Sequence, residues 1–284
     1  MKKAFLFLIV VSTFSQFYAQ HKKAYIIYTS DGTETDYFNM LEQVKQSDIT
    51  LFGEQHNSAI AHWLQFELTS DLIKHNGVTL GAEMFERDNQ EQLNQYLNGE
   101  IDRKGLDSLA RLWSNYKTDY APLVNLAQEN KIKFIATNIP RRYASQVFRN
   151  GFKALDSLSI EEKNWIAPLP IAFDPELPTY KNILTMMGEH GTPELVKAQA
   201  IKDATMAYSI LENKKENFIF LHYNGAYHSD YYEGILWYLK LSEPELKYIV
   251  ISTVTQNDIS KLENEHFGKG DFIIVVDENV TKTY

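Results

Sequence analysis

The chain has 284 residues, 44% of them hydrophobic and 23% charged, and a formal net charge of −9. This length and composition are typical of a globular protein with one large domain or two small ones. The acidic balance, without any run of Lys and Arg, argues against a nucleic-acid partner and against binding to an anionic membrane surface. The absence of cysteine excludes disulfides, thiolate catalysis, cysteine-ligated zinc and a lipid anchor attached to cysteine.

The N-terminal segment resembles a cleavable secretory signal. Lys2 and Lys3 form a charged start, and residues 4–11 form an apolar core that is too short to span a bilayer. We therefore expect residues 1–19 to be removed by a cut after Ala19, and the mature protein to be periplasmic or secreted. The alternative for these residues is a buried strand or a membrane anchor. No later segment is apolar enough for a transmembrane helix.

Residues 20–47 predict a small hairpin followed by a short helix. From residue 48 onward, short apolar runs alternate with helical patterns, which predicts an α/β fold with a mainly parallel sheet flanked by helices over residues 48–284. The helix-rich, proline-interrupted stretch from about 141 to 213 predicts a helical cap over one end of the sheet. Strands are expected at 49–52, 78–85, 132–139, 218–223, 248–254 and 272–276, and the clearest helices at 57–76, 89–97, 106–113, 121–130 and 194–213.

Polar residues with chemical potential follow the first strand of this alternating part. Glu54 and His56 belong to the run Gly53-Glu54-Gln55-His56, and His62 lies in the first turns of the next helix. A carboxylate and two imidazoles at a strand-to-helix turn can ligate a metal, or can act as a base and its orienting partner. Such a short motif is common in unrelated chains. The alternative to a chemical role is a structural one, in which a buried Glu54 satisfies the N-terminus of the helix.

Three later strands also end in polar groups. Glu83 lies in an apolar run, so its carboxylate must be paired or have a raised pKa. Arg87 is either its partner or faces an acidic ligand. Arg141 follows the third strand and suits carboxylate ligands, with a solvated surface position as the alternative. Because the carboxyl ends of parallel strands share one edge of a sheet, we expect one site there. The polar groups at these ends are Glu83 and Arg87, Asn138, Arg141 and Arg142, and His222, Asn224 and His228.

Five ordered segments resemble the ChaN-like haem-binding family, which belongs to a wider group with the erythromycin esterases and the Tiki proteases. The resemblance implies an α/β fold with an added helical part, and haem binding linked to iron acquisition at the cell surface. It also implies a site of Glu54, His56, His62, Glu83 and His228. The segments are LFGEQHNSAIAHWLQFEL, LGAEMFERDNQEQLNQYLNGEI, WSNYKTDYAPLVNLAQENKIKFIATNIPRR, AQAIKDATMAYSI and NGAYHSDYYEGILWYL.

In the family, the haem iron is held through a tyrosine with a histidine nearby, and an anionic oxygen ligand suits ferric iron. The resemblance leaves Tyr143, Tyr227 and Tyr231 as candidate ligands, with His228 close by. Arg87 and Arg141 are the candidates for the haem propionates, together with Arg142. This chain lacks the acylated cysteine of the family's lipoproteins, so it resembles a soluble exported member. A homodimer and an outer-membrane haem receptor are the protein partners that we expect.

Two functions therefore stay open on the sequence. The first is an exported haem-binding protein for haem and iron acquisition. The second is a hydrolase of an ester or amide, in which His56 is the general base and Glu54 orients it. In a metal-dependent version of the hydrolase, Glu54, His56 and His228 would instead hold a divalent metal. In both versions Glu83 or Arg87 would stabilise charge.

Overall fold

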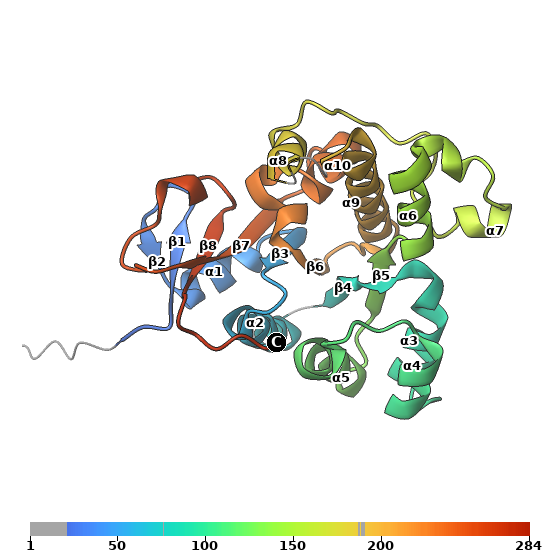
Figure 1. The fold of residues 1–284 in the computed structure, drawn as a ribbon. Helices are drawn as coiled ribbons and strands as arrows, with labels where there is room; N and C mark the ends of the chain where they lie inside the picture. The colour runs from blue at the N-terminus through green and yellow to red at the C-terminus, as the bar shows by residue number, and fades with distance from the viewer. Residues whose placement is uncertain (1–21, 76, 187, 189–190) are drawn as a thin grey trace, which may run out of the picture.

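An eight-stranded sheet forms the middle layer of the protein, in the order β2-β1-β8-β7-β3-β6-β4-β5 (Figure 1). The computed structural model describes residues 22–75, 77–186, 188 and 191–284, so the expected signal segment lies outside the described residues. The strands are β1 (Tyr25–Thr29), β2 (Glu34–Thr35), β3 (Ile49–Glu54), β4 (Val78–Glu86), β5 (Phe134–Asn138), β6 (Ile219–Gly225), β7 (Tyr248–Gln256) and β8 (Phe272–Asp277).

All pairings from β8 across the sheet to β5 are parallel, whereas β1 pairs antiparallel with both β8 and β2. The prediction of a mainly parallel α/β fold is therefore confirmed. The predicted N-terminal hairpin is present, and its pairing with β8 makes it an edge of the same sheet. Since the six parallel strands run in one direction, their carboxyl ends meet at one edge, where open α/β sheets bind ligands.

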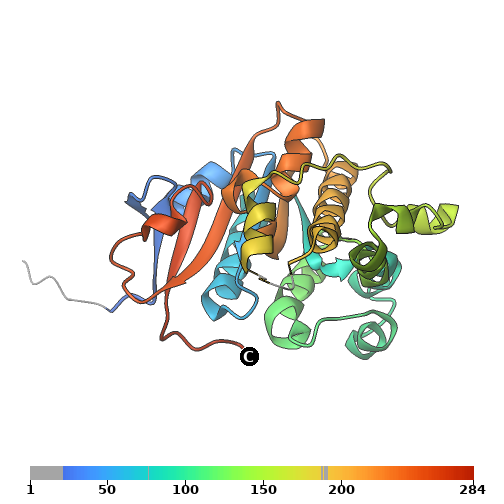
Figure 2. The ribbon, with the colours of Figure 1, turned by 45° about the horizontal axis from the view of Figure 1, so that its top comes forward.

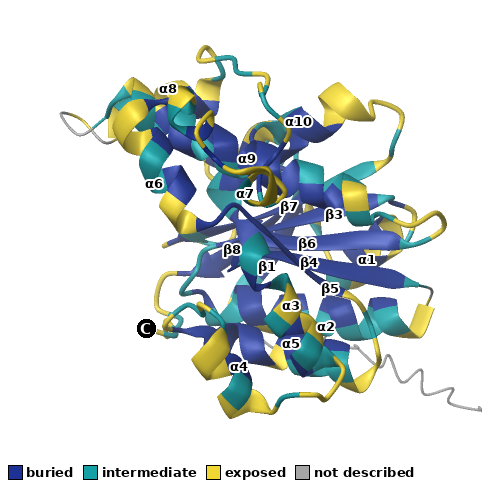
Figure 3. Cartoon of the chain, turned by 90° about the vertical axis from the view of Figure 1, so that its right-hand side faces the viewer, coloured by how far each residue is buried: buried dark blue, intermediate teal, exposed yellow. Residues whose placement is uncertain are grey.

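Helices cover both faces of the sheet, and the strands form a buried layer between them (Figure 3). On one face the first five helices pack on Phe52 and Leu221, and on the other face α9 and α10 pack on Leu51 and Phe220. Neighbouring residues of a strand point to opposite faces, and this double covering is the reason that the strands are continuously apolar in sequence. The helices are α1 (Tyr37–Val44), α2 (Ala59–His75), α3 (Gln90–Leu97), α4 (Arg103–Leu109), α5 (Ala121–Glu129), α6 (Arg141–Asn150), α7 (Ile160–Lys163), α8 (Pro178–Met186), α9 (Pro193–Asn213) and α10 (Ile235–Ser242).

The helical region from about 141 to 213 has two roles in the structure. Helix α9 covers a face of the sheet, with Met206 and Ile210 in the core cluster that also contains Phe220. Helix α8 lies beside α9 (Figure 2), where its Tyr180 packs with Val196 and Ala200, and two side chains of α8 line the cavity described below. Much of this region therefore belongs to the layer that covers the sheet. Helix α10 is an addition to the expected elements.

Two local features place the carboxyl end of β3. A Cβ on Gly53 would lie 2.8 Å from the Cα of Ala226 and 3.0 Å from the carbonyl oxygen of Ile251, so only glycine lets β3 end this close to its neighbours. The turn then enters α2, where the Ser58 hydroxyl accepts a hydrogen bond from the backbone N–H of Ala61. Within the described residues, we find no helix long and apolar enough to cross a membrane.

Candidate functional site

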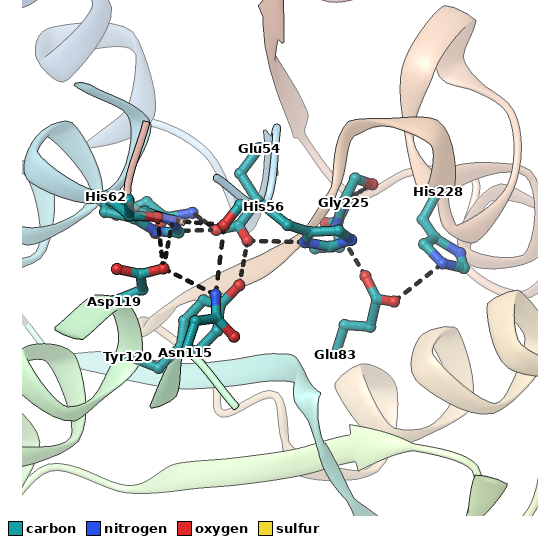
Figure 4. A network of polar contacts seen from close by, with 12 residues as sticks. Glu54, His56, His62, Glu83, Asn115, Asp119, Tyr120, Gly225 and His228 are labelled. Atoms are coloured by element: carbon teal, nitrogen blue, oxygen red, sulfur yellow. Dashed lines mark hydrogen bonds and ion pairs between the residues drawn. The ribbon is translucent and has the colours of Figure 1, made fainter. Parts of the chain in front are cut away.

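The ends of β3, β4 and β6 bring Glu54, His56, Glu83 and His228 together around Gly225 (Figure 4). Glu54 and Gly225 end β3 and β6 and lie opposite each other in the parallel pair. Glu83 comes from β4, and His228 ends the short 3₁₀ helix η5 (Ala226–His228) that follows β6. The four residues that sequence reasoning chose at three separate strand ends are therefore neighbours in space.

Glu54 is the centre of the first half of the site. Its side chain is 0% exposed, and both carboxylate oxygens are hydrogen-bonded. Oε1 accepts from Nδ1 of His56 at 3.0 Å and from the hydroxyl of Tyr120 at 2.6 Å, and Oε2 accepts from Nε2 of Gln65 at 2.6 Å. A buried carboxylate is tolerated only with such partners, so this arrangement fixes Glu54 as an acceptor.

His62 holds the backbone of the turn that carries His56. Its Nε2 donates to the backbone oxygen of His56 at 3.0 Å, and the same nitrogen lies 3.5 Å from Oδ2 of Asp119. Its Nδ1 lies 3.5 Å from Oε2 of Glu54. Asn115 donates a 2.8 Å hydrogen bond to Asp119. His62 is buried and engaged on both ring nitrogens, so it positions the His56 turn rather than facing a ligand.

His56 is the half-exposed member of the site. Because a carboxylate only accepts, Nδ1 of His56 carries the proton toward Glu54, and Nε2 is the free ring nitrogen. A Cβ on Gly225 would lie 2.9 Å from that Nε2, so the ring occupies the space above the glycine. Burial opposes the charged ring, but the hydrogen bond to Glu54 and the nearby Glu83 carboxylate raise the pKa of His56 above its ordinary value.

The second half of the site is a chain of buried charges through His228. Oε2 of Glu83 accepts the backbone N–H of Gly225 at 2.7 Å, and Oε1 lies 3.2 Å from Nε2 of His228. The other ring nitrogen, Nδ1, donates to Oδ1 of Asp203 on α9. The hydroxyl of Tyr180 on α8 donates to Oδ2 of Asp203 at 3.1 Å. One imidazole therefore lies between two carboxylates.

This arrangement keeps His228 protonated. Burial would lower the pKa of His228, but the Glu83 and Asp203 carboxylates outweigh it and raise the pKa to about 10. Burial also opposes ionisation of Glu83, yet the imidazolium and the Gly225 amide hold the pKa of Glu83 well below its usual value. For Asp203 burial dominates and raises the pKa of the carboxyl. His228 is thus a fixed cation with no free lone pair.

An open cavity of about 510 Å³ lies over this site. An apolar wall comes from α8 and α9, the floor holds the polar residues just described, and further lining residues come from β7 and the loop that follows it. The lining residues that matter below are Ile183, Met186 and Leu195 on the apolar wall, Tyr227, and His266 and Lys269 in the loop after β7. The volume is in the range of small-molecule sites.

The three candidate tyrosines have different positions. Tyr227 lines the cavity, and its hydroxyl accepts a 2.9 Å hydrogen bond from Nδ2 of Asn182. Tyr231 is 40% exposed and donates to the backbone oxygen of Glu265 at 2.6 Å, outside the lining residues. Tyr143 is 1% exposed in the core between α6 and α9, where it donates to Glu162. Only Tyr227 of the three faces the site.

The predicted arginines lie away from the cavity. Arg87 donates to Ser209 and to Glu212, and it lines a separate pocket beside β5. Arg141 is exposed at the first residue of α6, and Arg142 pairs with Asp88. For Arg141 and Arg142 the reason is the position of β5, which is the outer strand of the sheet, two strands beyond β6.

The predicted metal ligands Glu54, His56 and His228 do not form a compact set. Over the described ranges, the one group of three ligand atoms within 4.8 Å of one another is Glu263, Glu265 and His266, of which the two glutamates are exposed. His228 is bracketed by carboxylates, so it offers no nitrogen to a metal at neutral pH.

Sequence reasoning missed Asp203, Gln65 and Tyr120. Asp203 had a usable signal, since it lies on the apolar face of α9 between Ala200 and Ala204, both buried. An acid at a buried helical position must have a partner, which here is His228. Gln65 and Tyr120 carry no such signal, because polar residues of these types are common on helices.

The charge on His228 predicts how stability depends on pH. The folded pKa of about 10 lies above the ordinary value of 6.5, so folding takes up a proton between these values. The contribution of this proton to the free energy of unfolding is complete below about pH 6.5 and is lost as the pH rises toward about 10. The Asp203→Asn variant lacks one of the two carboxylates that raise the pKa of His228. We expect its free energy of unfolding to be lower than that of the wild type by about 1–3 kcal/mol, and to decline less steeply as the pH rises. Urea unfolding from about pH 6 to about pH 9 measures both.

Asp230→Asn is the matched control, because Asp230 is also a buried carboxylate at this cavity but pairs with Lys269 rather than with His228. It should keep the wild-type dependence on pH. An Asp203→Asn protein with an unchanged dependence would contradict the assignment of the charge to His228.

Comparison with known proteins gives the family. The model for the family described as haem-binding uptake, Tiki superfamily, ChaN matches residues 40–239. The fold is similar to that of ChaN of Campylobacter jejuni, which binds haem cofacially, with a TM-score of 0.65, 16% identity, and coverage of 89% of this chain and 97% of that chain. A succinoglycan biosynthesis protein follows with a TM-score of 0.51, 12% identity, and coverage of 84% and 90%.

Protein RETICULATA-RELATED 5, a chloroplastic protein of Arabidopsis thaliana, is 27% identical over 164 residues, or 52% of this chain. The chain spans only 22% of the length of that relative. The family match spans well over half of the chain, and it confirms the resemblance found in the sequence segments. The protein therefore belongs to the ChaN family of haem-binding uptake proteins in the Tiki superfamily.

Proposed function

We propose that this protein binds haem in the cavity over Glu54 and His228, with Tyr227 as the residue that holds the iron. The observation that carries the proposal is the cavity itself. It has an apolar wall of Ile183, Met186 and Leu195 beside a phenol, in a chain that belongs to a haem-binding family. An apolar wall with a few placed polar groups is the usual form of a cofactor site.

The residues present fit haem chemically. When bound, ferric haem supplies a Lewis-acidic iron and two carboxylates. The phenolic oxygen of Tyr227 is an accepted iron ligand, and its hydrogen bond from Asn182 orients it. Burial raises the pKa of Tyr227, so its hydroxyl keeps its proton until a cation is near. His56 is the imidazole with a free nitrogen beside the cavity, whereas His228 is engaged on both sides.

A haem titration of the mature chain tests this proposal. We expect a Soret band that saturates with added haem, and at least about tenfold weaker binding in Tyr227→Phe, because the anionic ligand is removed. Tyr231→Phe is the matched control and should keep wild-type affinity, since Tyr231 does not line the cavity. A wild-type protein without a saturable Soret band would refute haem binding. Equal affinity in Tyr227→Phe would refute the choice of ligand.

A second candidate function is hydrolysis of an ester or amide, and the Glu54–His56 pair supports it. Glu54 fixes the tautomer and the direction of the imidazole, which leaves Nε2 to accept a proton from water. Gly225 makes room for this imidazole, because a Cβ at that position would lie 2.9 Å from Nε2 of His56. The fixed cation of His228, held by Glu83, lies next to the same floor. The two functions use different parts of one cavity, the polar floor and the apolar wall.

The hydrolase candidate predicts turnover of activated esters such as p-nitrophenyl esters by the purified protein. We expect His56→Gln to reduce the rate by about 10²–10⁴, the usual contribution of a general base. His75→Gln, an exposed histidine at the end of α2, is the control and should keep the full rate. If the wild type gives no turnover above the control reaction with buffer, the catalytic candidate is wrong.

We also propose that the protein is exported and takes part in haem and iron acquisition. The supporting features are the signal-like start of the chain and the description of its family as haem-binding uptake. Cell fractionation with mass spectrometry checks the first step: the exported product should begin at Gln20. An unprocessed chain found only inside the cell would contradict it. The homodimer and the outer-membrane receptor stay predictions from the resemblance.

A further inference from the structure

The loop after β7 brings to the lining of the cavity a lysine whose place is fixed by its backbone. Lys269 follows the short 3₁₀ helix η7 (Asn264–His266). Its carbonyl oxygen accepts the backbone N–H of Tyr231 at 2.9 Å, and its own N–H donates to the carbonyl oxygen of His266 at 3.3 Å. Among the described residues that line the cavity, Lys269 is the only lysine or arginine.

The ammonium group of Lys269 is also held in place. Nζ lies 3.4 Å from Oδ2 of Asp230 and 5.8 Å from the centre of the Tyr231 ring, and the side chain is 18% exposed. Asp230 is itself buried, and its Oδ1 accepts a 2.6 Å hydrogen bond from Ser252. A lysine ammonium has three donors. Asp230 uses one of them, so donors remain for a group in the cavity.

The other ionisable groups of the cavity are already committed. The carboxylate of Glu54 has three donors, and Nδ1 of His56 is one of them, so that His56 keeps only Nε2 free. The cation of His228 lies between Glu83 and Asp203. Burial and the neighbouring Lys269 lower the pKa of His266, so that ring is neutral. Apart from the half-exposed His56, Lys269 is therefore the cationic side chain of the described lining that can still meet an anionic group of a ligand.

We propose that Lys269 forms a carboxylate-binding subsite of the cavity, which takes a propionate of the haem while the apolar wall of α8 and α9 takes the ring. The inference rests on the proposed haem function. Haem has an apolar ring with carboxylates at one edge, and the cavity likewise combines an apolar wall with a lysine among its lining residues. The subsite takes over the role that the sequence suggested for Arg87, Arg141 and Arg142, which lie elsewhere.

Paired titrations with ferric haem and with ferric haem dimethyl ester test the subsite, because the diester keeps the iron and the ring but has no carboxylate charge. We expect the wild type to bind the free acid at least about tenfold more tightly than the diester, as a charge-assisted hydrogen bond implies. Lys269→Met should lose this preference and keep the wild-type affinity for the diester. Lys261→Met, an exposed lysine of the same loop, should keep the preference.

The outcomes separate the two proposals. A wild type that binds neither form refutes the haem function, and the subsite with it. A wild type that binds both forms equally, or a Lys269→Met protein that keeps the preference, overturns the subsite and leaves haem binding in place. Thermal unfolding of each variant shows whether it is folded. If Lys269→Met is unfolded, Lys269→Gln replaces it. The subsite is then tested by whether Lys269→Gln loses the preference for the free acid over the diester.

Discussion

The need to pair carboxylates that the fold has buried is the constraint on which the rest of this site depends. Glu54, Glu83 and Asp203 are all buried, and an unpaired charge at such positions would cost more than the fold could offset. Each acid therefore takes its partners from other parts of the chain: α2 and the turn before α5 for Glu54, the end of β6 for Glu83, and α8 for Asp203. The same bonds that satisfy the acids also hold the helical layers against the edge of the sheet.

The parts of this site that sequence could predict are those that depend on strand direction alone. Glu54, Glu83 and His228 follow apolar runs, and parallel strands must present such ends together. Strand order, which depends on long-range packing, is not readable in the same way. This is why Arg141, after the outer strand β5, was expected at the site and lies away from it, while Lys269 in a loop was overlooked. Helix α10 was missed because it is short and has apolar residues on all sides, so its sequence shows no clear helical period.

The cavity combines features of a binding protein and of an enzyme. Its floor has an oriented imidazole and a fixed cation, which an esterase would use, and its wall has the apolar surface that a porphyrin needs. The two halves differ in how tightly they are built. Of the polar atoms of the floor named above, all but Nε2 of His56 have a protein partner, whereas the wall is formed by side chains with freedom to adjust, such as Met186. A ligand that enters this cavity therefore meets a rigid surface on one side and an adaptable one on the other.

The close contact between Gly225 and His56 has a consequence for how related sequences can vary. The imidazole fills the volume that any side chain at position 225 would require, so the two positions share one space. A side chain at 225 therefore requires either that the His56 ring moves or that residue 56 becomes smaller, and both changes would disturb the hydrogen bond that Glu54 accepts from His56. The residues that positions 54, 56 and 225 can hold thus depend on one another.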